Sequence, residues 1–412
     1  MQSDQRGPRG ERPGTAAGDG VRPALPIVFA ITATGIMTTT LITPSLPEIL
    51  RGVGAAPGQA GLVIGAATLP GIVLAPVIGL LADRFGRREV LVPCLVLFGL
   101  AGGLAATSPS LGWLLAWRFL QGAGAAGLVN LAVVLIGDHW VGGRRAAMIG
   151  RNSAVLTTCI TVLPLIGGVL TDLGGWRAPF LLYPLALGTA GLVARRLPPS
   201  TRRRVDIGEQ LRDLRPALRQ PGVVRALGAG AITFALVFGL LLTVMPLHLE
   251  QAFGVSPSIR GLVLGLPAVA NTVAALSAGR LQRFSKRALL TTATVLFAIS
   301  LAFVAVAPSL LLLVAAIAFF GAGQGLMVPN LQDIAVRSSD TSRGAVVALF
   351  VSSARTGQTA GTVAGAAAFG ALGGPTTFAL SAGACLLLLL PLTLGAPRGS
   401  SAEPPPGPLV AG

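Results

Sequence analysis

Few side chains in this 412-residue sequence could do chemistry, and the fullest group lies in the run 79–88. Glycine within such a run allows close helix packing and a tight turn, while an aspartate can face a helix N-terminus or an arginine. A plain basic loop would explain the arginines but not the spacing of the glycines and the aspartate. The run therefore predicts a charged turn built from Gly79, Asp83, Arg84, Gly86, Arg87 and Arg88.

Residues for catalysis or metal binding are not grouped anywhere in the sequence. His139 and His248 have no ligand spacing around them. The only lysine, Lys286, does not lie in a P-loop. The three cysteines lie inside apolar runs, where they are typical small core residues. We therefore expect no enzyme, no receptor, no nucleotide-driven pump and no cofactor.

The composition places these few polar residues in a membrane protein. Hydrophobic residues make up 52% of the chain and charged residues 11%, compared with about 25% charged residues in ordinary soluble domains. The net charge of +16 comes from short bursts of arginine between long uncharged stretches, whereas a nucleic-acid binder gathers its charge on one folded face. The sequence predicts an all-α polytopic membrane protein that does not bind nucleic acid.

Twelve runs are long and apolar enough to cross a bilayer, which takes about 20 residues as a helix. They cover residues 24–47, 58–81, 90–107, 112–136, 147–171, 178–197, 225–249, 260–281, 288–306, 309–331, 345–370 and 376–396. If the N-terminus is inside, 26 of the 31 lysines and arginines fall on the inner side and three on the outer side. This bias predicts that both termini are cytoplasmic and that the protein lies in the inner membrane.

The chain divides into two halves that resemble each other. At an offset of 200, residues 60–81 and 260–281 are identical at eight of 22 positions, including Gly61 with Gly261 and Gly65 with Gly265. Two pseudo-symmetric six-helix halves suit a transporter that rocks one half against the other. We expect a disordered N-tail at 1–23, a first half at 24–197, a basic linker at 198–224, a second half at 225–396 and a C-tail at 397–412.

The run 79–88 resembles the loop 2–3 signature of the major facilitator superfamily. Span four contains Arg118, Gln121 and Gly122, which are similar to the arginine-glutamine-glycine motif of that family. An arginine inside the bilayer is expensive and marks a functional candidate, although Arg118 could instead snorkel to the surface. The resemblance implies the major facilitator fold and a gating role for the loop 2–3 residues.

Span five resembles the antiporter motif of drug exporters in that family. Four of its positions match, namely Gly150, Pro164, Gly167 and Gly168, while Cys159 and Leu163 replace two glycines. The resemblance implies a secondary transporter that exports a small amphipathic drug or metabolite as a monomer. The alternative is an uptake permease or facilitator for a sugar or an organic anion. Protons are one candidate coupling ion, with another ion or facilitated diffusion as alternatives, because no span carries an acid near its middle.

The resemblance also implies that spans one, four, seven and ten line a central path, with span eleven nearby. Arg118 and Arg355 are the only charges well inside these spans, so a cationic ligand would be desolvated without a counter-ion. We therefore expect neutral or anionic substrates. The candidate cavity residues are Thr34, Met37, Thr38, Asn130, Phe234, Phe238, Gln324, Asn330, Arg355 and Gln358.

Overall fold

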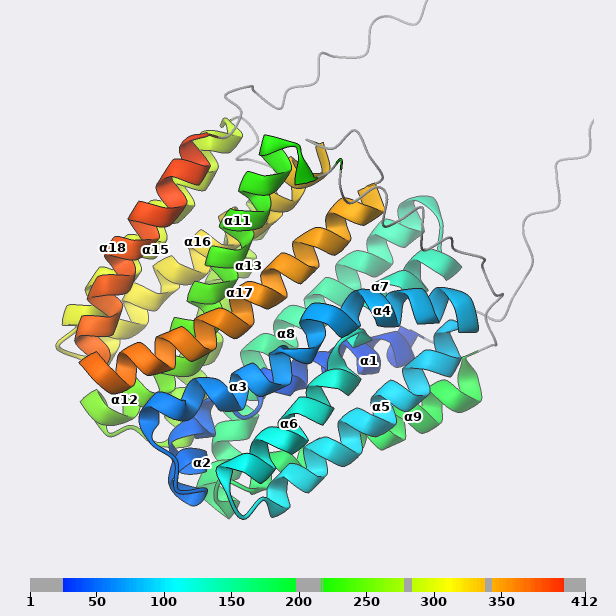
Figure 1. The fold of residues 1–412 in the computed structure, drawn as a ribbon, viewed down its shortest axis with the longest axis horizontal. Coiled ribbons are helices and arrows are strands. Elements are labelled where there is room, and N and C mark those ends of the chain that lie inside the picture. The colour runs from blue at the N-terminus through cyan, green and yellow to red at the C-terminus, as the bar shows by residue number, and fades with distance from the viewer. Residues whose placement is uncertain (1–24, 198–215, 217, 278–283, 338–342, 396–412) are drawn as a thin grey trace, which may run out of the picture.

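The computed structural model describes residues 25–197, 216, 218–277, 284–337 and 343–395, and every regular element within these ranges is a helix (Figure 1). The expected tails at 1–23 and 397–412 lie outside the described residues, as does most of the expected linker at 198–224. The fold is therefore that of an all-α membrane protein, as the composition predicts.

The first half contains six membrane-crossing units, several of them built from more than one helix. Proline begins some of these pieces, since its fixed φ suits the first helical turn and its missing N–H is not needed there. The elements are α1 (Leu25–Thr40), η1 (Thr43–Ser45), α2 (Leu46–Gly52), η2 (Pro57–Gln59), α3 (Ala60–Thr68), α4 (Pro70–Phe85), α5 (Arg87–Leu104), η3 (Ala105–Thr107), α6 (Leu111–Ala125), α7 (Leu128–His139), α8 (Gly142–Gly174), η4 (Ala178–Leu182) and α9 (Leu185–Arg196).

The second half repeats this plan with longer helices. The first span of this half, which is span seven of the chain, contains a π-helical segment, η5. There the Thr243 hydroxyl donates to the Phe238 carbonyl, five residues earlier, at 2.7 Å. The elements are α11 (Pro221–Leu236), η5 (Val237–Val244), α12 (Met245–Phe253), α13 (Pro257–Leu276), α15 (Lys286–Val306), α16 (Leu310–Arg337), α17 (Arg343–Leu372) and α18 (Gly374–Leu394).

Eleven of the twelve expected spans are, among the described residues, long and apolar enough to cross a membrane. The remaining one corresponds to α17, which has 30 residues and is long enough. Arg355 and Gln358 make its middle more polar than that of the other spans. The helix α17 is therefore a span with an unusually polar centre.

The two halves lie side by side and touch mainly toward one end of the bundle. α3 and η2 pack against α17, and α8 packs against α13 (Figure 1). We call the face near η2 and the end of α17 the closed face. The opposite face, where α1 begins and α18 ends, is the terminal face. From the closed face toward the terminal face, α4 and α17 diverge in Figure 1.

Candidate functional site

Two helix pairs join the halves, and each contains glycines from the sequence repeat. A Cβ atom at Gly61 of α3 would clash with the carbonyl of Thr362 in α17. A Cβ atom at Gly261 of α13 would clash in the same way with the carbonyl of Pro164 in α8. Small residues let helix backbones approach closely within a membrane. The repeated glycines therefore lie where the two halves touch, at pseudo-symmetric positions.

Two of the four motif residues in span five, Pro164 and Gly168, take part in these contacts. Pro164, Gly167 and Gly168 are buried in α8. A Cβ atom at Gly167 would clash with the Leu41 carbonyl in span one, and a Cβ atom at Gly168 would clash with the beginning of α13. Gly150 differs, because no atom in the described part of the chain lies within 4 Å of a Cβ built there. Gly150 is therefore not closely packed in this arrangement of the halves.

Four charged side chains connect the halves at the closed face. Arg260 at the beginning of α13 pairs with Glu48 in α2, and Arg51 pairs with Glu48 at 3.1 Å and with Glu250 in α12. The Arg260 side chain is only 1% exposed, whereas that of Arg51 is 62% exposed. Sequence reasoning did not identify this network, although opposite charges on the sparsely charged outer side were a signal for it.

The turn at 79–88 forms a charge cluster within the first half. Gly86 has φ +114°, a conformation that favours glycine, and it separates α4 from α5. Arg87 pairs with Asp83 at 2.6 Å and with Asp138 at the end of α7 at 3.1 Å. Arg88 is half-buried, whereas Arg84 is exposed and lies over the Phe85 ring at 5.5 Å. Close packing was expected at Gly79, but no described atom lies within 4 Å of a Cβ built there.

The second half carries a matching cluster at the terminal face. Lys286 at the beginning of α15 pairs with Asp333 near the end of α16 at 3.1 Å, and Asp333 also pairs with Arg337 at 2.8 Å. The Lys286 ammonium also donates to the Asn330 amide oxygen at 2.8 Å. Asn330 was expected in the central cavity, but it belongs to this cluster. The cluster of the second half therefore also contains an acid. This acid, Asp333, lies on α16, whereas Asp83 of the first half lies at the end of α4.

Arg118 is fully buried and bonded within the first half. Its guanidinium donates to the Thr38 carbonyl at 2.6 Å, to the Val63 carbonyl at 3.4 Å and to the Gln121 amide oxygen at 2.5 Å. Its exposed fraction is 0%, so it does not snorkel to the surface. The motif in span four therefore ties α6 to α1 and α3. A Cβ atom at Gly122 would clash with the backbone of α3, which shows how closely the two helices pack there.

Arg355 in α17 lies in a different environment. Its side chain is partly exposed, and its Nη1 donates to the Gln358 amide oxygen at 3.5 Å. Its Cδ and Nε atoms lie 3.4 Å from the position that a Cβ would take at Gly71 of α4. The guanidinium therefore rests against the first half, across the boundary between the halves.

The remaining cavity candidates are divided between buried and accessible positions. The hydroxyls of Thr34 and Thr38 are buried and donate to carbonyls of their own helix, at 2.8 Å and 2.7 Å. Neither hydroxyl is therefore free to donate to a ligand, which corrects the expectation for both. Asn130 is exposed, whereas Met37, Phe234, Phe238 and Gln324 are half-buried.

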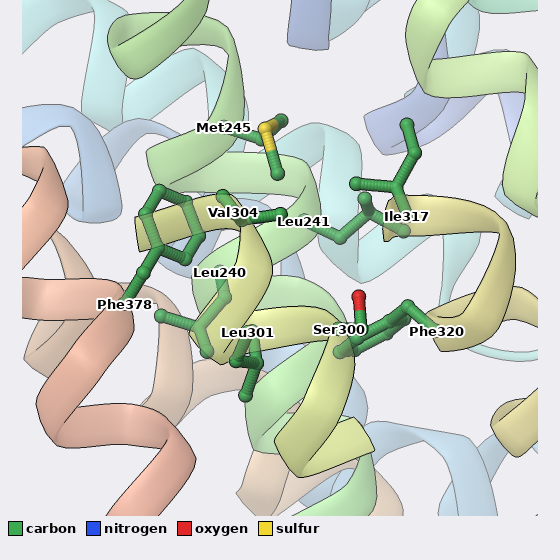
Figure 2. A pocket seen from close by; sticks show the side chains of 9 residues that line it. All are labelled: Leu240, Leu241, Met245, Ser300, Leu301, Val304, Ile317, Phe320 and Phe378. Atoms are coloured by element: carbon green, nitrogen blue, oxygen red, sulfur yellow. The ribbon is translucent and has the colours of Figure 1, made fainter. Parts of the chain in front are cut away.

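A small cavity within the second half is apolar and does not lie between the halves (Figure 2). Its volume is about 10 Å³, which is room for about one water molecule. Leu240 and Leu241 of η5 line it, and Ser300 of α15 contributes its only polar side chain. It is too small to hold a transported molecule.

Comparison with known proteins identifies the family. The family model described as Major Facilitator Superfamily matches residues 28–240 and 227–410, which together cover most of the chain. The chain belongs to the major facilitator superfamily. It is therefore a transporter, and the two matched segments overlap at residues 227–240, in span seven.

Several curated relatives of this major facilitator protein are named for export. The bacillibactin exporter of Bacillus subtilis (strain 168) is 24% identical over 80% of this chain and 86% of its own length. The cephamycin export protein CmcT of Amycolatopsis lactamdurans is 34% identical over 59% of this chain and 53% of its own length. The puromycin resistance protein of Streptomyces alboniger is 32% identical over 59% of this chain, and this match spans 45% of the relative.

Solved transporters share the fold of this major facilitator protein. The inward-facing, unoccupied structure of a bacterial homologue of the human lysosomal transporter Spinster matches with a TM-score of 0.71 and 18% identity. This match covers 90% of this chain and 94% of the other. The human organic anion transporter MFSD10 matches with a TM-score of 0.64 and 19% identity over 89% of this chain and 98% of the other. At these identities the likeness concerns the fold alone.

Proposed function

We propose that this transporter works by alternating access and exports a small amphipathic drug or metabolite from the cytoplasm, with its terminal face on the cytoplasmic side. The arginine bias of the loops supports that orientation. In that orientation the closed face is the outer face, so the arrangement of the halves is inward-facing.

The observation that carries the proposal is the contact between span five and span eight. Pro164 and Gly168, two matches to the exporter motif, lie against α13 of the opposite half. A residue at this boundary affects how closely the halves approach, and therefore how readily they separate. The names of the bacillibactin, cephamycin and puromycin relatives also favour export over uptake.

Protons are the proposed coupling ion, and the proton-binding site would lie at the closed face or the terminal face rather than in the middle of a span. The spans carry no acid near their middle, so a central carboxylate relay of the usual kind is not available. The acids at the faces include Glu48 and Asp83, each of which pairs with an arginine. Collapsing an imposed pH gradient with nigericin should stop export, whereas another coupling ion would leave it unchanged.

Direction is tested in membrane vesicles of known orientation. Inside-out vesicles from a pump-deficient host expose the cytoplasmic side to the medium. They should accumulate a labelled phenicol-like drug only when they contain this protein, and right-side-out vesicles should not. Accumulation confined to right-side-out vesicles would establish uptake instead. A resistance panel of phenicol-like drugs, acidic compounds and ethidium-like dyes then compares neutral, anionic and cationic compounds.

Orientation has its own test. A fluorescent reporter fused after Gly412 should be bright, and a phosphatase that is active only in the periplasm should be silent at the same point. An active phosphatase there would place the terminal face outside and overturn the proposed direction.

A further inference from the structure

A row of polar side chains on α17 faces the first half of the transporter. Arg355, Gln358, Thr359 and Thr362 follow the spacing i, i+3, i+4 and i+7, which places them on one side of a helix. The Thr359 hydroxyl lies 2.9 Å from that of Thr68 in α3, in the opposite half. Arg355 lies against α4, as described above. The polar side of α17 therefore lies along the boundary between the halves.

Within this row, Arg355 carries a charge that the protein does not balance. No carboxylate in the described part of the chain pairs with it, and its single hydrogen bond, to Gln358, is long at 3.5 Å. A guanidinium has five N–H donors, so most of its donors remain available. An intramembrane charge is costly and normally pairs with another group. This position therefore suits a charged ligand better than a purely structural role.

Two other buried arginines, Arg118 and Arg260, have partners within the protein that Arg355 lacks. The guanidinium of Arg118 donates to two backbone carbonyls and one amide oxygen in its own half. Arg260 is paired with Glu48 at the closed face. Arg355 therefore differs from Arg118, each of whose guanidinium nitrogens donates to an oxygen, and from Arg260, whose charge Glu48 balances although its Nε and Nη1 have no partner in the described part of the chain. Arg355 also lies where the halves must separate and rejoin during transport.

We propose that Arg355 is the anion-binding residue of this transporter and that its ligands are amphipathic organic anions carrying one carboxylate. This inference rests on the proposed transport function and specifies the substrate class. Arginine holds a carboxylate through two parallel N–H···O bonds. Gln358 accepts a bond from Arg355, which leaves its amide N–H groups as additional donors. The apolar part of the ligand would lie along span seven, which packs against α17 and carries the half-buried Phe234 and Phe238.

Binding to the purified full-length protein in nanodiscs tests the inference. Three probes share one ring system and differ in charge: 2-naphthylacetate, 2-naphthylacetamide and a naphthylmethyl-trimethylammonium salt. Wild type should bind the carboxylate roughly tenfold to a hundredfold more tightly than the amide, the range expected for one charge-assisted contact. The quaternary ammonium probe should bind most weakly.

Variants of Arg355 test whether it is the residue that binds the carboxylate of the ligand. Arg355→Gln should lose the preference for the carboxylate while its affinity for the amide stays within about twofold. Arg355→Lys should retain part of the preference, because it keeps the charge but loses the planar fork. Arg337→Gln is the matched control, because it removes one charge from an exposed side chain that pairs with Asp333 at the terminal face. It should bind all three probes as wild type does.

Several results would overturn the inference. These are equal binding of carboxylate and amide by wild type, no measurable binding of the carboxylate, or an unchanged carboxylate preference in Arg355→Gln. Vesicle transport separates this failure from failure of the proposed function. Export of neutral drugs without a carboxylate preference would reject only the anion site. Arg355-dependent carboxylate binding without accumulation in inside-out vesicles would reject only export.

Discussion

Arg118 and Arg355 are the two arginines that lie well inside membrane spans, and their surroundings differ in nearly every respect. Arg118 is fully buried within one half and donates to three oxygen atoms from three helical segments. Arg355 is partly exposed at the boundary between the halves and has one long hydrogen bond to a neighbour on its own helix. The comparison suggests that one charge holds a half together and that the other is available to a ligand.

The difference arises from the acceptors that each arginine can reach. Backbone carbonyls of adjacent spans reach Arg118 because the small residues of α6, such as Gly122, bring the helices close together. Arg355 faces the opposite half, where its guanidinium lies beside Gly71 of α4, a residue with no side chain to accept a hydrogen bond. A motif match or a hydropathy profile identifies both arginines as unusual but does not distinguish their roles.

The largest expected effect is the loss of stability when Arg118 is removed. Arg118→Ala removes the guanidinium donor from the Thr38 and Val63 carbonyls and from the Gln121 amide oxygen, at a cost of about 1–3 kcal/mol for each buried group that stays unsatisfied. The Tyr183 hydroxyl, 3.4 Å from the Thr38 carbonyl, remains as a second donor there. The melting temperature in detergent should fall sharply, whereas Arg355→Ala should change it little. Equal destabilisation by the two variants would contradict the division of roles.

A second large effect is expected at the closed face, where another buried arginine depends on one partner. Glu48→Gln leaves Arg260 without an acid partner, which typically costs about 3–5 kcal/mol at a fully buried site. Spin labels at Ser110→Cys and Leu311→Cys, on the two halves near the closed face, should report longer distances in this variant. Arg51→Gln is the control, because a largely exposed pair contributes about 0–1 kcal/mol. Unchanged distances in Glu48→Gln would show that the glycine contacts alone close this face.

A moderate effect is expected from the neighbour of Arg355. Gln358→Ala removes one neutral hydrogen-bonding group, worth about 0.5–1.5 kcal/mol. The affinity for 2-naphthylacetate should therefore fall roughly twofold to tenfold, less than in Arg355→Gln. Thr356→Ala serves as the control, because this exposed hydroxyl donates to a carbonyl of its own helix at 3.0 Å. An effect of Thr356→Ala as large as that of Gln358→Ala would mean that the polar row is not the binding surface.

The smallest effect is expected at the turn 79–88. Asp83→Asn weakens a partly exposed ion pair with Arg87, so expression and melting temperature should be close to those of wild type. If Asp83 faces a helix N-terminus when the terminal face closes, the loss is about 0.3–1 kcal/mol. The transport rate should then fall up to about fivefold. Transport kinetics identical to wild type would remove Asp83 from the gating mechanism.

Sequence reasoning predicted the number and approximate limits of the spans because apolar length alone determines which segments cross a membrane. It also identified the repeated glycines, although not that they form the contacts between the halves. It did not identify the pairing of Glu48 with Arg260, because the partners lie 212 positions apart and on different halves, and opposite charges on the outer side were the only signal for it. It missed the Asn330–Lys286 contact for a related reason, since hydropathy does not show which way a polar side chain points within a span.

Two further differences concern motif residues. The open space beside Gly79 and Gly150 shows that a motif glycine need not be packed in every arrangement of the halves. The acceptors of Arg118 are mostly backbone carbonyls, which carry no residue-specific signal in a sequence. Both features depend on how the spans pack rather than on their composition.

The most direct test of the central claim is the charge selectivity of transport in inside-out vesicles. The rates for 2-naphthylacetate and 2-naphthylacetamide are measured in wild type, Arg118→Lys and Arg355→Gln, each normalised to the amount of folded protein. The account predicts that the carboxylate-to-amide ratio falls at least about tenfold in Arg355→Gln and is preserved in Arg118→Lys. A ratio preserved in Arg355→Gln and lost in Arg118→Lys would contradict it.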